Sequence, residues 1–125
     1  MQSDQNIPLR KQRGHEGELL AKKYLQKNGY RILDINWQTR WAEIDLVAID
    51  GDTLVFVEVK TRHSREYGAP EEAITPHKLK SLEHSALLFK QQHPELPEAL
   101  RIDFVGIDYA EGDKPRINLI KNISL

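Results

Sequence analysis

Residues 43–60 read EIDLVAIDGDTLVFVEVK, and this stretch decides the fold that the sequence predicts. Two apolar segments flank Asp50-Gly51-Asp52, and a glycine turn of this kind is the strongest short-range signal of a β-hairpin. We therefore expect strands over residues 43–50 and 53–61. Apolar side chains alternate onto both faces of the second arm, so that strand should be covered on both sides.

One helix is expected before this hairpin in the chain and a second helix after it. Residues 14–28 carry apolar residues at helical spacing and end at Asn28-Gly29, a common way for a helix to stop. A second helix should begin at Thr75-Pro76, with Thr as the N-cap and Pro as the first helical residue, and end near Pro94.

The other segments rich in β-branched and aromatic residues complete the predicted fold. They predict further strands over residues 30–37, 101–108 and 116–122. The element order is then αβββαββ, an α/β fold with a mixed sheet flanked by helices. We expect a single domain over residues 13–125 after a flexible tail of residues 1–12.

Composition narrows the classes of function. The chain has 125 residues, with 18 Lys and Arg against 19 Asp and Glu, and a formal net charge of −1. This balance argues against a general polyanion binder. The absence of cysteine excludes disulfides, thiol nucleophiles and Cys-ligated zinc. No signal peptide or membrane span is visible, so we expect a cytoplasmic protein with no membrane partner.

Charged residues stand at unusual positions within the predicted hairpin. Asp45 and Glu58 lie among apolar residues, where a covered sheet rarely places charges. A two-residue Gly51-Asp52 loop would put Asp45 directly opposite Glu58, and an Asp50-Gly51 loop would make them diagonal neighbours on one face. A three-residue loop would separate them onto opposite faces, so the interpretation depends on an even loop.

Two carboxylates facing each other across a strand pair repel. A divalent cation would relieve this repulsion, and Mg²⁺ or Mn²⁺ prefers such oxygen ligands. Lys60 lies two residues after Glu58 on the same face, where it could orient or deprotonate an attacking water and stabilise a pentavalent transition state. The alternative for this E-x-K pattern is a buried ion pair with a structural role only.

The hairpin also resembles a known signature. Residues 43–48 followed by residues 54–62 are similar to the EIDLIA and LVFVEVKxR motifs of the YraN family, uncharacterised bacterial proteins that resemble Holliday junction resolvases and other restriction-endonuclease-like nucleases. The resemblance spans about residues 10–120, with Ala42 in place of the usual Gly as one departure. It includes Gly14, Glu18, Tyr24-Leu25, Gly29-Tyr30, Asn36-Trp37, Tyr67-Gly68, Pro70, Lys78 and residues 101–105.

The resemblance implies a nuclease core of the PD-(D/E)XK superfamily and a set of site residues. Asp45, Glu58 and Lys60 match the D…ExK triad, and Glu18 matches an acidic residue on the first helix. The implied metal ligands are Asp45, Glu58 and Glu18, with Mg²⁺ or Mn²⁺ as the cofactor. Glu18 shares a helical stripe with apolar residues and should face the sheet, although an acidic residue early in a helix can also stabilise the helix dipole.

Basic residues near the triad are candidate phosphate contacts or, alternatively, ordinary solvated side chains. They are Arg62, Arg65, Lys78 and Lys80. Trp37 and Trp41 are expected in the core rather than stacked on bases.

The sequence therefore leads to two functional hypotheses. The first is a metal-dependent DNA endonuclease that hydrolyses phosphodiester bonds in branched or damaged DNA, with single-stranded DNA as another substrate form. A homodimer would suit a junction with two strands to cut. The second is a catalytically silent nucleic-acid-binding or protein-interaction module on the same fold.

Overall fold

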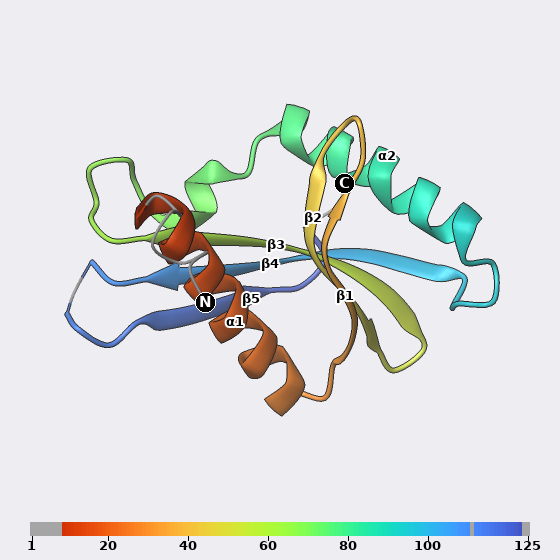
Figure 1. Ribbon diagram of the computed structural model, residues 1–125, viewed down its shortest axis with the longest axis horizontal. Coiled ribbons are helices and arrows are strands. Elements are labelled where there is room, and N and C mark those ends of the chain that lie inside the picture. The colour runs from red at the N-terminus through yellow and green to blue at the C-terminus, as the bar shows by residue number, and fades with distance from the viewer. Residues whose placement is uncertain (1–8, 111, 124–125) are drawn as a thin grey trace, which may run out of the picture.

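One mixed sheet with a helix on each face forms the molecule (Figure 1). The computed structural model describes residues 9–110 and 112–123, with side chains from residue 14 onward. The sheet has the order β1-β2-β3-β4-β5, in which β3 and β4 are parallel and the other neighbours antiparallel. The strands are β1 (Arg31–Gln38), β2 (Glu43–Asp50), β3 (Thr53–Arg62), β4 (Ala99–Asp108) and β5 (Arg116–Ile120).

The predicted order αβββαββ and the α/β class are confirmed. Helix α1 (Leu9–Lys27) precedes the first three strands, and α2 (Pro76–Gln92) crosses between β3 and β4. A short 3-10 helix, η2 (Pro70–Ala73), precedes α2 and was not predicted. The arrangement is consistent with a restriction-endonuclease-like core.

The β2–β3 hairpin has the two-residue loop Gly51-Asp52. Asp50 pairs with Thr53, and the ladder continues as far as Leu46 and Val57. Gly51 has a φ of 64°, a left-handed conformation that glycine adopts without strain. The same register extended by one residue sets Asp45 opposite Glu58.

Apolar side chains on the two faces of β3 build two separate core clusters. Val55 and Val57 pack with Ala21 and Leu25 of α1, and Phe56 packs on the opposite face with residues of α2. The expected covering of both faces is confirmed. Burial of each such side chain stabilises the fold by roughly 1.5–3 kcal/mol, which makes β3 a firm support for the polar residues at its end.

The start of helix α2 was predicted correctly, but the start of helix α1 was not. Thr75 caps α2, since its side chain accepts a hydrogen bond from the backbone N–H of Lys78. Helix α1 begins at Leu9, so residues 9–12, predicted as tail, are helical. These residues are good helix formers, and the prediction followed apolar spacing alone. Residues 1–8 of the predicted tail lie outside the described residues.

Within the described part of the chain, no helix is long and apolar enough to cross a membrane.

Candidate metal centre

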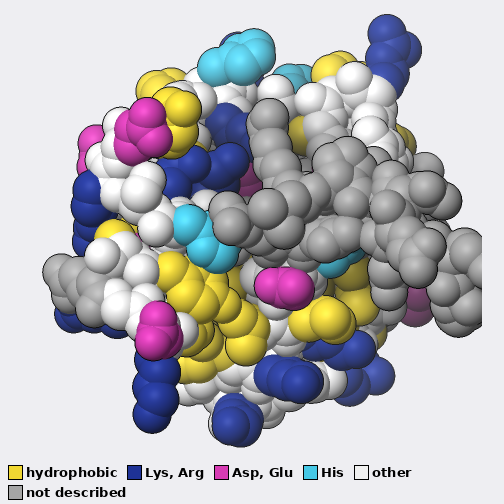
Figure 2. All heavy atoms as spheres, turned by 60° about the vertical axis from the view of Figure 1, so that its left-hand side comes forward, with side chains coloured by type: hydrophobic (Ala, Val, Ile, Leu, Met, Phe, Trp, Pro, Cys, Tyr) yellow, Lys and Arg dark blue, Asp and Glu magenta, His cyan; other side chains and the backbone are white. Residues whose placement is uncertain are grey.

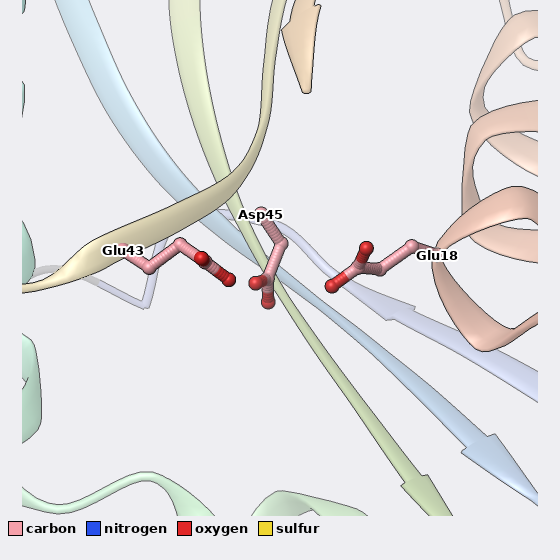
Figure 3. Close-up of side chains that lie close together, drawn as sticks. All are labelled: Glu18, Glu43 and Asp45. Atoms are coloured by element: carbon pink, nitrogen blue, oxygen red, sulfur yellow. The ribbon is translucent and has the colours of Figure 1, made fainter. Parts of the chain in front are cut away.

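Three carboxylates converge where β2 begins, beside α1. Glu18 extends from α1, and Glu43 and Asp45 extend from β2, with their side chains directed toward one another (Figure 3). A carboxylate oxygen from each residue lies within 4.8 Å of one from each of the others. This is close enough for all three to share one cation.

Close packing of α1 on β3 brings Glu18 to this point. A Cβ added at Gly17 would lie 2.2 Å from Thr61 Oγ1, so only glycine permits this approach without a shift of Thr61. The neighbouring Glu18 side chain is 17% exposed, as expected for a residue that faces the sheet. The helix-dipole alternative for Glu18 is wrong, because α1 begins at Leu9 and Glu18 is well past its first turn.

Asp45 is a buried carboxylate with little to neutralise it. Its residue is 8% exposed, and its Oδ2 accepts a hydrogen bond from the backbone N–H of Val59 at 2.8 Å. Burial, followed by the nearby charge of Glu58, raises the pKa of Asp45 far above its usual range, and Glu18 adds to the effect. Burial also raises the pKa of Glu18, with a further contribution from Glu43. The cluster thus resists carrying its full negative charge in the metal-free protein.

Glu58 lies next to Asp45 but has a cationic partner of its own. Lys78 Nζ, from the first turn of α2, is 2.8 Å from Glu58 Oε2. Burial alone would lower the pKa of Lys78, but the hydrogen bond to Glu58 and the charges of Asp45 and Glu43 raise it above its ordinary value. The structure therefore places Glu58 between an acidic neighbour and a basic one.

Lys60 lies between two hollows that open on either side of this cluster. One, of about 440 Å³, is lined by Asp45, Glu58, Lys60 and Lys78 on the α2 side. The other, of about 880 Å³, is lined by Lys60 together with Glu18 and Arg62 on the α1 side. Figure 2 shows basic side chains set back in a hollow of one face, with histidines near its rim.

The four basic residues predicted to contact nucleic acid differ in whether a carboxylate of the protein already pairs with them. Lys78 pairs with Glu58, and Arg65 Nη2 lies 2.6 Å from Asp108 Oδ2. Lys80 is exposed on α2. Arg62 lines the larger hollow, and its Nε is buried without a hydrogen-bond partner among the described residues. Lys78 and Arg65 would have to leave their carboxylate partners to meet a phosphate, so Arg62 and Lys80 are better placed to do so.

Two further features escaped prediction from the sequence. Asn36 of β1 makes a side-chain hydrogen bond to Glu18 and has a left-handed φ of 55°. Asn36 is among the residues of the family resemblance, but neither its contact with Glu18 nor its backbone conformation was predicted, and Asn tolerates that conformation better than most residues. Trp37 packs edge-to-face on Phe89 as expected. Trp41, however, is 48% exposed beside the smaller hollow, because it lies in the β1–β2 turn rather than in a strand.

Comparison with known proteins matches residues 17–107 to a family described as "Uncharacterised protein family UPF0102". The chain belongs to this family. A UPF0102 protein of Syntrophomonas wolfei is 44% identical over 114 residues, which cover 91% of this chain and 98% of that protein. One of Renibacterium salmoninarum is 43% identical over 110 residues, covering 88% and 93%. UPF0102 is the YraN family, so the resemblance seen in the sequence is confirmed.

A third UPF0102 protein, from Rhodococcus opacus, is 39% identical over 109 residues, covering 87% of this chain and 92% of that protein. The region that matches the family spans Glu18, the β2–β3 hairpin and α2. It therefore contains every residue of the candidate metal centre.

Proposed function

We propose that this UPF0102 protein is a divalent-metal-dependent endonuclease that hydrolyses phosphodiester bonds in branched or damaged DNA. The observation that supports it best is the convergence of Glu18, Glu43 and Asp45 within 4.8 Å beside Glu58, at the edge of two hollows. Folding alone gives no reason to gather these like charges around the buried Asp45, since each makes the others harder to ionise.

The donor set fits a hard cation. Mg²⁺ and Mn²⁺ take carboxylate oxygens together with waters, and Glu18, Glu43 and Asp45 provide three carboxylates. Glu58 would join them once its ion pair with Lys78 opens. When bound, the cation supplies Lewis-acid polarisation and charge neutralisation at a phosphoryl group.

The protein's own residues supply positioning and charge. Lys60 lies two residues after Glu58 on β3 and lines both hollows, so its ammonium can stabilise negative charge that develops on a phosphate held beside the carboxylates. A neutral Lys60 could instead take a proton from the attacking water. Arg62 and Lys80 would hold flanking phosphates. A homodimer and a cytoplasmic location are part of the same proposal.

A cleavage assay tests the proposal. Wild-type protein is incubated with labelled four-way junctions, flaps and single strands in Mn²⁺ or Mg²⁺, with Asp45→Asn as the matched variant. We expect cation-dependent cleavage of at least one branched substrate by wild type and none by Asp45→Asn. Lys60→Ala should lose cleavage and keep Mn²⁺ affinity, because Lys60 is not a ligand.

A silent binding module is the second candidate, and the ion pair between Lys78 and Glu58 favours it. That pair already neutralises one of the proposed ligands. The two functions differ in one experiment, single-turnover cleavage in Mn²⁺ alongside DNA binding in Ca²⁺. Wild-type protein that binds DNA but cuts no substrate with either cation, together with Lys60→Ala that binds equally well, would establish the module and exclude the enzyme.

A further inference from the structure

Asn36, in β1, combines three unusual features next to Glu18. Its φ of 55° is left-handed, and among the described residues Asn122 is the only other non-glycine with positive φ. Its side chain hydrogen-bonds Glu18. Its Oδ1 is buried without a hydrogen-bond partner among the described residues.

Two of these features oppose folding. A left-handed backbone is less favourable for Asn than for glycine, although Asn tolerates it better than most residues. A buried acceptor without a partner loses its bonds to water and gains nothing in return. Neither feature gives a folding reason for an amide at position 36, so the side chain requires another explanation.

The hydrogen bond to Glu18 supplies that explanation. Because Oδ1 has no partner, the donor to the Glu18 carboxylate is the Asn36 Nδ2 group. A donated hydrogen bond favours the charged carboxylate and fixes its direction. Metal ligands are commonly oriented in this way by neighbours that do not touch the metal.

We infer that Asn36 is a positioning residue of the metal centre, whose left-handed backbone aims its amide at Glu18 and so holds that carboxylate toward Glu43 and Asp45. The inference rests on the proposed function, because it assigns Asn36 a role only if the acidic cluster binds a cation. Asn36 acts through Glu18 and not on the substrate.

Calorimetric titration of the full chain with Mn²⁺ tests this role. Asn36→Gly keeps the backbone conformation and removes the amide, so it should fold with an equal or higher melting temperature and bind Mn²⁺ roughly 10- to 100-fold more weakly. Asn122→Gly is the matched control, since Asn122 shares the left-handed backbone, with a φ of 59°. Its backbone N–H bond to Asp103 survives the change, and its Mn²⁺ affinity should equal that of wild type.

A double-mutant cycle separates positioning from a general structural role. If Asn36 acts through Glu18, the double variant Asn36→Gly, Glu18→Gln should bind Mn²⁺ as Glu18→Gln alone does. Losses that add would overturn the inference. So would wild-type affinity in Asn36→Gly, or its failure to fold, and both outcomes leave the proposed function standing. Absence of Mn²⁺ binding by wild type would overturn the metal centre and the role of Asn36 together.

Discussion

Acidic residues gather at both ends of β2, and the two groups are neutralised in opposite ways. At the end of the strand, Arg101 lies 2.6 Å from Asp50 and 2.8 Å from Asp103, while Tyr30 donates to Asp103 at 2.6 Å. Lys121 also approaches Asp50, at 3.3 Å. At the start of the strand, Glu18, Glu43 and Asp45 of the candidate metal centre face mainly one another.

The pKa values of Asp50 and Asp45 are shifted in opposite directions. The hydrogen bond from Arg101 lowers the pKa of Asp50, although burial opposes it. Burial and the charge of Glu58 raise the pKa of Asp45 instead. The carboxylates around Arg101 are paired with cations of the chain, whereas around Asp45 three carboxylates lie within 4.8 Å of one another, beside the ion pair of Lys78 with Glu58. Substitutions in the two groups should therefore change stability in opposite directions.

Loss of Arg101 should have the largest effect. Asp103 is fully buried, and Arg101→Met would leave it and Asp50 without their main partner. Removal of one member of a buried ion pair destabilises by about 3–5 kcal/mol. Urea unfolding measures this directly, and a loss below about 1 kcal/mol would show that the paired cluster does not support the fold.

Asp45→Asn should stabilise the metal-free protein. The amide oxygen can still accept the hydrogen bond from Val59. The amide is also neutral, so folding no longer has to protonate this side chain or bury its charge beside Glu58. We expect a gain of about 1–3 kcal/mol at neutral pH.

The gain should depend on pH. Because the folded-state pKa of Asp45 is raised, its proton stabilises the fold fully below the unfolded value of about 3.9, and this contribution is lost as pH rises through the folded-state pKa. Urea unfolding at several pH values should show almost no difference between Asp45→Asn and wild type near pH 3 and a growing difference toward pH 8. A difference that stays constant with pH would contradict the assignment of repulsion to Asp45.

The smallest effect is expected at the ion pair that links the cluster to α2. The Lys78 side chain is 47% exposed, so Lys78→Met should reduce stability by only about 0.5–1 kcal/mol. It should tighten Mn²⁺ binding, because the ammonium no longer competes for Glu58. Lys80→Met, an exposed neighbour on the same helix, is the control, and equal Mn²⁺ affinity in both variants would rule out competition between Lys78 and the cation.

The hairpin shows how much could be predicted from sequence. Alternating apolar residues and the Asp-Gly turn predict the strands of residues 43–60, but the pattern alone leaves the length of the loop open. The proximity of Asp45 and Glu58 was predicted for an even loop, and the observed pairing of Asp50 with Thr53 provides one. The start of α2 was equally visible, since Thr75 and Pro76 specify a cap by local chemistry.

Long-range and backbone features could not be predicted in the same way. The ion pair of Lys78 with Glu58 depends on how far α2 lies from β3, and no local pattern encodes that distance. The φ of Asn36 depends on its tertiary surroundings, because propensity gives Asn only a mild tolerance for the left-handed region. The early start of α1 was missed because its first turns carry helix formers without an apolar stripe.

The central claim is that the acidic cluster is built for a divalent cation, and one measurement tests it most directly. Unfolding free energies of wild type and Asp45→Asn are compared at neutral pH without metal and with Mn²⁺. At a Mn²⁺ concentration about 100 times Kd, binding adds about 2.7 kcal/mol to the stability of wild type. We expect Asp45→Asn to be the more stable protein without metal and wild type to gain far more from Mn²⁺. Equal gains for the two proteins, or no gain for either, would contradict the claim.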